Sequence, residues 1–310
     1  MVLNMSLDKI LGHSAAIFTV SVWAVTYIWT KYLLEDFSPT DILLIRFTIG
    51  FIVLKIMWPK GIKFDLKLEP YFMVAGLLGT CLYFYTENVA LTMTTACNVG
   101  IILAITPLFT AITSKIFFPK EEKLTLKFFL GFIAALSGII LLSTKGNASL
   151  EFNPLGDSLA VLAGFVWSFY CVATKKANKL NYNPIQVTRR SFFWGIVFIV
   201  PLALIHGINI TYENIIKPTN LTYLLSLGIC ASAFCFASWN YAVKKIGAVS
   251  TIVYLYATPP LTIIFAYMVL GEELTIDGFI GSGLILLGLI ISQGLLLKPL
   301  KYALSKSKKS

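Results

Sequence analysis

The sequence predicts an all-α polytopic membrane protein with ten transmembrane helices, arranged as two inverted five-helix repeats. Three observations lead to this fold: apolar blocks of bilayer-spanning length, lysines that alternate between connections, and two halves with matching residues. Of the 310 residues, 57% are hydrophobic and 13% are charged, and the mean hydropathy is +0.80. A soluble chain carries roughly 25% charged residues. The composition therefore excludes a soluble protein.

Ten apolar blocks of about 18–23 residues can each cross a hydrocarbon layer about 30 Å thick. The first block is too long for a typical signal-peptide core, and no cleavage pattern follows it. We therefore expect it to be a permanent span. The blocks lie near residues 14–34, 40–58, 71–91, 95–117, 126–143, 158–177, 185–206, 221–243, 248–270 and 278–297.

The basic residues predict the orientation. Of 25 basic residues, 22 are lysines, and 19 of these lie in the tails or beside even-numbered connections. Only Lys31, Lys145 and Lys217 belong to odd-numbered connections. The positive-inside rule then places both termini in the cytoplasm, with the chain in the cell (inner or plasma) membrane. Topology thus explains the net charge of +10, without a nucleic-acid partner, and the basic tail 298–310 can contact membrane lipid.

The two halves of the chain match at offsets of 144 to 152 residues. Since each half, 1–143 and 144–297, contains five spans, the second must insert upside down relative to the first. Inverted repeats are typical of secondary transporters, whose substrate site lies near the midplane between the halves. The matched pairs include Trp23 with Trp167, Arg46 with Arg190, Gly76 with Gly228, Asn88 with Asn240, and Thr106-Pro107 with Thr258-Pro259.

With these residues, each half resembles an EamA domain of the drug/metabolite transporter superfamily. Further parts of the pattern are Lys120-Glu121-Glu122 before Leu124-Thr125, and Gly271-Glu272-Glu273 before Leu274-Thr275. The resemblance implies a cavity lined mainly by spans 1, 3, 4, 6, 8 and 9, and export of amino acids, related metabolites or drugs. Small multidrug-resistance relatives use a glutamate in their first span. This chain has none there, so their proton-for-drug mechanism is not carried over.

Glu87 is the one carboxylate predicted to lie well inside a span. An ionisable group in hydrocarbon is costly, so it should face the bundle interior and have a function. Tyr83 and Thr80 precede it at helical spacing, which gives one polar face. Its repeat equivalent is Trp239, so symmetry is broken here. We expect Glu87 to bind a substrate ammonium or to carry a coupling proton; the alternative is a structural carboxylate near the outer interface.

Aromatic residues are predicted to form the walls of the substrate cavity, since such walls suit aromatic, apolar or cationic solutes. Trp and Tyr also mark membrane interfaces, but Trp23 and Trp167 lie near the middle of their spans. The predicted cavity residues are Trp23, Tyr27, Tyr83, Glu87, Asn98, Trp167, Trp239 and Tyr254.

Arginine is rare in this lysine-rich chain, which predicts a special role for Arg46 and Arg190 near the starts of spans 2 and 7. A guanidinium can bond several acceptors at once, unlike an ammonium. We expect a structural anchor that ties helix ends together, with substrate or gate contact as the alternative. The repeat-equivalent Asn88 and Asn240 are expected to be structural hydrogen-bonding residues between helices.

Two further features concern motion and packing. Pro107 and Pro259 interrupt spans 4 and 9 at equivalent points and are predicted hinges. Glycines and alanines at four-residue spacing in spans 5 and 10 predict close helix packing or a homodimer.

These patterns favour a secondary transporter, most simply an exporter of small metabolites such as amino acids, that works by alternating access. A cation or multidrug exporter with Glu87 as charge partner is the alternative. An enzyme would need a cluster of acids, ligands or a nucleophile with its base, and a channel would not need an inverted repeat. No metal site and no cofactor are expected.

Overall fold

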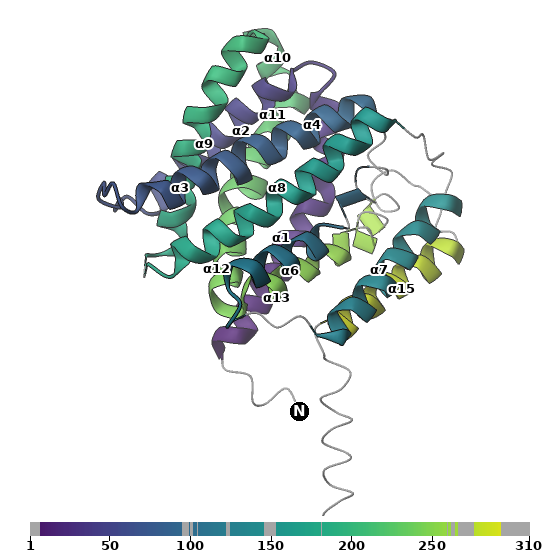
Figure 1. Cartoon of the computed structure of the whole chain (residues 1–310). Coiled ribbons are helices and arrows are strands. Elements are labelled where there is room, and N and C mark those ends of the chain that lie inside the picture. The colour runs from purple at the N-terminus through teal and green to yellow at the C-terminus, as the bar shows by residue number, and fades with distance from the viewer. Residues whose placement is uncertain are drawn as a thin grey trace, which may run out of the picture.

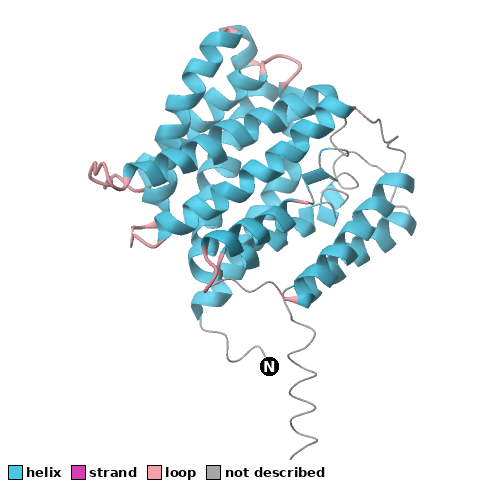
Figure 2. Cartoon of the chain, in the orientation of Figure 1, coloured by secondary structure: helices cyan, strands magenta, loops and turns pink. Residues whose placement is uncertain are grey.

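The computed structural model describes residues 7–94, 99, 102–103, 105–121, 125–145, 153–180, 182–258, 260–261, 264–265 and 276–292. Within these ranges the chain forms helices joined by short loops, without strands (Figure 2). The first half contributes α1 (Leu7–Leu33), α2 (Pro39–Met57), α3 (Glu69–Gly76), η1 (Leu77–Leu82), α4 (Tyr83–Met93), α6 (Thr106–Phe117) and α7 (Leu126–Lys145). The second contributes α8 (Pro154–Asn178), α9 (Pro184–His206), α10 (Tyr212–Ile216), α11 (Pro218–Leu225), η2 (Ser226–Phe234), α12 (Cys235–Ile246), α13 (Ala248–Ile252), η3 (Val253–Ala257) and α15 (Ile276–Ser292).

Helical residues coincide with every one of the ten predicted apolar blocks. Four helices of the described chain are long and apolar enough to cross a membrane: Leu7–Leu33, Pro154–Ala177, Pro184–His206 and Pro218–Ile246. Shorter apolar helices lie at Leu126–Leu141, Ala248–Ala257 and Ile280–Ser292. The all-helical fold is therefore confirmed, while the count of ten spans stays a prediction.

Helices α2 and α9 both begin with a capping box. Ser38 accepts a hydrogen bond from the Asp41 N–H while Asp41 bonds back to the cap, and Pro39 opens the helix. Asn183 and Gln186 form the same reciprocal cap at the start of α9. A capping box satisfies backbone donors that a helix start otherwise leaves free. These caps fix where each helix begins and hence the height of its arginine.

Two long helices contain a π-helical segment in the middle. The first is α3–η1–α4, and the second is α11–η2–α12. Residues 77–82 correspond to 229–234 at the offset of 152, so both segments occur at equivalent places. π-Helical insertions interrupt the regular α-helical hydrogen bonds and are frequent at functional sites.

Small residues at equivalent positions let the two halves approach closely. A side chain at Gly76 would begin 2.5 Å from the Ser191 carbonyl oxygen of α9. At Gly228 it would begin 2.5 Å from the Ile49 side chain of α2. Thus α9 of the second half packs on the η1 region of the first half, and α2 of the first half packs on η2 of the second.

Helices α7 and α15 lie side by side at one flank of the bundle (Figure 1). Their small residues face each other: a side chain at Gly131 or Gly138 would collide with the Gly288 or Gly281 carbonyl oxygen, each at 2.5 Å. The glycines of spans 5 and 10 therefore serve packing within one chain. A homodimer through these spans stays a prediction and would have to use their other, apolar faces.

Candidate functional site

Glu87 lies in the second turn of α4 and is only 5% exposed. The hydroxyl of Tyr83, one turn earlier, donates a hydrogen bond of 2.9 Å to Glu87 Oε1. Tyr27 of α1 interacts with both of these side chains. The carboxylate is thus accompanied by phenols from two helices. This arrangement is what a buried acid requires, because an unsolvated carboxylate is strongly disfavoured.

Arg46 lies close enough to Glu87 for electrostatic attraction, yet the described side chains form no direct ion pair between them. The guanidinium is buried, at 2% exposure, and lies 4.4 Å from the Phe84 ring centre. Its Nε donates a hydrogen bond of 3.1 Å to Ser232 Oγ in η2. Arg46 therefore lies in the third turn of α2, with its side chain in the bundle interior. The site brings together a carboxylate and a guanidinium cation.

Three tryptophans from three helices contact one another beside Glu87 and Arg46. Ring centres of Trp23 and Trp167 are 5.6 Å apart, those of Trp23 and Trp239 are 5.1 Å apart, and Tyr83 lies 4.6 Å from Trp167. Trp239 is fully buried, and Trp23 Nε1 donates a hydrogen bond of 3.0 Å to the Ala231 carbonyl oxygen. The rings contact one another directly. The cluster therefore joins α1, α8 and α12 beside Glu87.

The buried donors without a hydrogen-bond partner in the described chain include Trp167 Nε1, Trp239 Nε1 and Asn88 Nδ2. A buried donor without an acceptor costs roughly 1–3 kcal/mol. Asn240 differs from its repeat equivalent, because its Nδ2 donates to Thr188 Oγ1 at 2.8 Å. The hydrogen bonds of Asn240 support a structural role between helices, whereas the Asn88 Nδ2 donor has no partner. The structural role of both asparagines stays a prediction.

Arg190 makes the contacts expected of an anchor. Its Nε lies 3.1 Å from both oxygens of Glu69, its Nη2 bonds the same carboxylate, and Trp194 Nε1 donates to Glu69 at 2.6 Å. Glu69 opens α3 and is 3% exposed. The pair thus ties the start of α3 to α9. Our reading of the sequence missed Glu69; an arginine in a lysine-rich chain was the signal that a buried carboxylate should be sought.

Of the remaining predicted cavity residues in the described chain, Tyr254 lies away from the tryptophan cluster. Tyr254 contacts His13, with 2.7 Å between its hydroxyl and His13 Nδ1. Since His13 precedes Trp23 by ten residues, it lies about 15 Å away along α1. Pro107 lies in the first turn of α6, where its missing N–H breaks no helical hydrogen bond. Asn98 and Pro259 lie outside the described residues, and the hinge roles stay predictions.

Known proteins resemble this chain over most of its length. An uncharacterized transporter of Archaeoglobus fulgidus is 29% identical over 270 residues, covering 84% of this chain and 90% of the relative. A probable terminal-alkyne amino-acid exporter of Streptantibioticus cattleyicolor is 26% identical over 281 residues, covering 89% and 91%. A protein crystal structure matches with a TM-score of 0.76 at 19% identity, covering 94% of this chain and 98% of that chain, which shows a shared fold.

The model of the EamA-like transporter family matches twice, at residues 10–144 and 154–293. Together these two matches cover nearly all of the chain. The proteins of this family are multi-pass membrane transporters, and the buried polar site described above lies between helices of both matched segments. The chain belongs to the EamA-like transporter family.

Proposed function

We propose that this transporter exports small metabolites, with amino acids as the leading substrate class, by alternating access between two inverted repeats, 1–143 and 144–297. The observation that carries this proposal is the presence of two buried groups of opposite charge, the Glu87 carboxylate and the Arg46 guanidinium, next to an aromatic cluster. An amino acid has an ammonium and a carboxylate on one carbon atom. Glu87 can bind the first group and Arg46 the second, which a guanidinium fork does well.

The shell around the charges supports a substrate that carries an apolar part. Trp23, Trp167 and Trp239 come from α1, α8 and α12, so both halves contribute walls. The unpaired Trp167 Nε1 and Asn88 Nδ2 can donate to a carboxylate oxygen. The resemblance to a probable amino-acid exporter supports the same class.

Ion pairs that connect the two halves at opposite ends support the alternating-access mechanism. At the end that we assign to the outside, Lys217 Nζ lies 2.7 Å from Asp36 Oδ1. At the end that we assign to the cytoplasm, Lys175 Nζ lies 3.3 Å from Glu121 Oε2, and Lys245 Nζ lies 2.8 Å from Asp8 Oδ2. Rocking one half against the other would break the links at one end and keep those at the other. Both termini would then face the cytoplasm in the cell membrane.

The equivalent contacts of the two halves support their inverted relationship. Gly76 packs against α9, and Gly228 packs against α2. The two contacts are equivalent, with the roles of the halves exchanged. Such an exchange is what a two-fold axis in the membrane plane produces.

A cation or multidrug exporter is the second candidate. Aromatic faces attract cations through their quadrupoles, and Glu87 could neutralise a single positive charge without help from Arg46. Coupling to protons fits both candidates, since a buried carboxylate can be protonated and released once in each cycle.

Transport into proteoliposomes separates the two candidates. The panel comprises amino acids with apolar side chains and quaternary ammonium compounds, with Arg46→Gln compared to wild type. An amino-acid transporter should lose its substrate when the guanidinium is removed, whereas a cation transporter should keep or gain activity. Transport of neither class, or equal transport by Glu87→Gln, would contradict the proposed site.

A further inference from the structure

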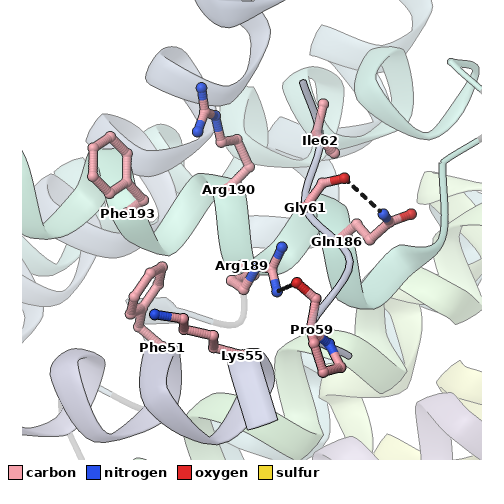
Figure 3. A pocket seen from close by; sticks show the side chains of 9 residues that line it. All are labelled: Phe51, Lys55, Pro59, Gly61, Ile62, Gln186, Arg189, Arg190 and Phe193. Atoms are coloured by element: carbon pink, nitrogen blue, oxygen red, sulfur yellow. Dashed lines mark hydrogen bonds between the residues drawn. The ribbon is translucent and has the colours of Figure 1, made fainter. Parts of the chain in front are cut away.

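A second polar hollow lies between α2 and α9, at the end of the bundle that carries the 58–68 connection (Figure 3). Its volume is about 170 Å³, several times the roughly 30 Å³ that one water occupies in the liquid. None of the residues that line the hollow belongs to the Glu87 site, and Lys55 lies nine residues, about 14 Å along α2, from Arg46. The hollow is therefore separate from the Glu87 site. Its principal polar lining residues are Lys55, Gln186, Arg189 and Arg190.

The hollow carries uncompensated positive charge. Arg190 is neutralised by Glu69, and Figure 3 shows its guanidinium directed away from the Pro59–Gly61 segment. Arg189 is held instead by neutral acceptors, the carbonyl oxygens of Trp58 and Lys60. Lys55 makes no ion pair within the described part of the chain. Lys55 and Arg189 thus leave two positive charges facing a space that a phosphate group can enter.

An apolar track leads away from this charged hollow along α9. Phe51 and Phe193 form its wall, with ring centres 6.5 Å apart. From Phe193 the exposed side chains Val197, Val200 and Leu204 follow at spacings of four, three and four residues, which keeps them on one helix face. A ligand with an anionic head and an apolar chain matches both the hollow and the track.

We propose that this hollow binds the headgroup of an anionic phospholipid, whose acyl chain lies along the exposed face of α9. The phosphate is held by Lys55 and Arg189, and the Gln186 amide borders the same space while bonded to the Lys60 carbonyl oxygen at 3.0 Å. Basic pockets between spans at the cytoplasmic side bind such headgroups. The lysine distribution assigns this end of the bundle to that side. The bound lipid would brace α2 against α9 and the connection that Arg189 holds.

Native mass spectrometry of the full chain in mixed micelles tests this proposal. Wild type is compared in phosphatidylglycerol and in phosphatidylcholine, and each bound lipid is counted. We expect phosphatidylglycerol to be retained preferentially at one site, and Lys55→Gln to weaken that retention about fivefold, as expected for one basic group near a membrane surface. Lys63→Gln is the matched control, because Lys63 is exposed in the 58–68 connection at the same end of the bundle but does not line the hollow.

Lys55 is exposed, so Lys55→Gln should fold normally, which its unfolding temperature in phosphatidylcholine checks. Lys55→Arg keeps the charge and should keep the lipid. Equal retention by wild type and Lys55→Gln would overturn the proposal. So would displacement of the lipid by millimolar sodium phosphate, since the ligand would then be a soluble phosphate. Neither result would bear on substrate transport through Glu87.

Discussion

The helix α3–η1–α4 and its counterpart α11–η2–α12 have the same framework and different centres. Both contain a π-helical segment, and both are crossed at an equivalent glycine by a helix of the other half. Towards their ends, however, one has Glu87 and Asn88, whose Nδ2 has no partner, while the other has Trp239 and Asn240, whose Nδ2 donates to Thr188. The first also opens with Glu69, where the second has Leu221.

The comparison of these two helices separates the residues that hold the halves together from the residues that form the site. The glycines that are alike in both helices meet atoms of the other half at close range, so their size is set by packing. The positions of Glu69 and Glu87 carry a carboxylate in one helix and an apolar side chain, Leu221 or Trp239, in the other. An amino acid, the proposed substrate, has no two-fold symmetry, so a site that binds it between two equivalent halves would have to differ from one half to the other.

The largest expected effect is the loss of stability on removing the ion pair of Arg190 with Glu69, an anchor that only the first helix has. Arg190→Ala leaves Glu69 buried without its cation, and breaking a buried ion pair in this way costs about 3–5 kcal/mol. Reversible unfolding in detergent measures the loss. The double variant Glu69→Gln with Arg190→Gln should recover part of it. A loss below about 1 kcal/mol would show that the pair is not an anchor.

Glu87→Gln tests the centre of the first helix. The amide keeps the shape and the hydrogen bond from Tyr83 but removes the charge. A charged hydrogen bond contributes roughly 1.5–3 kcal/mol, so transport should fall about tenfold or more, and its dependence on pH between about 5.5 and 8 should disappear. Glu213→Gln, on exposed α10, is the control that should change neither property. An unchanged rate and pH profile would leave Glu87 as a structural residue.

Gly76→Ala and Gly228→Ala test the framework that the two helices share. Each added methyl group would lie 2.5 Å from an atom of the other half, and overpacking of this kind costs about 1–3 kcal/mol. We expect both variants to lower the unfolding temperature to a similar extent. Gly283→Ala in α15 meets no atom within 4 Å and should be neutral or slightly stabilising. Strongly unequal losses would argue against equivalent contacts.

The smallest effect is expected at the outer ion pair. Hydrogen bonds from the Lys217 ammonium and the Asn220 amide lower the pKa of the Asp36 carboxyl group from its ordinary value of 3.8. A lowered pKa means that the stabilisation is complete above pH 3.8 and is lost only as the pH falls through the lowered value. Asp36→Asn should therefore leave the shape of the transport pH profile between about 5.5 and 8 unchanged, in contrast to Glu87→Gln. A flattened profile in Asp36→Asn would move the titrating group from the site to the outer link.

The sequence by itself determined the membrane class, the helices and the family. Apolar blocks of bilayer length are set by the thickness of hydrocarbon, and backbone groups in lipid must bond within a helix, so composition alone decides both. It also singled out Glu87, Trp23 and Trp167, because a buried acid and mid-span tryptophans are unusual for lipid-facing positions. The count of ten spans, the orientation and the inversion rest on charge and repeat patterns and stay predictions.

Only the tertiary structure decided which residues meet. Arg46 and Arg190 are repeat equivalents with the same local sequence role, yet one lies beside Glu87 and the other binds Glu69. Likewise, Tyr254 pairs with His13 and not with the tryptophan cluster. Helical periodicity defines the face on which a side chain lies, but not the partner across the interface. That partner depends on the height and rotation of a second helix, which are set by packing contacts such as those of Gly76 and Gly228.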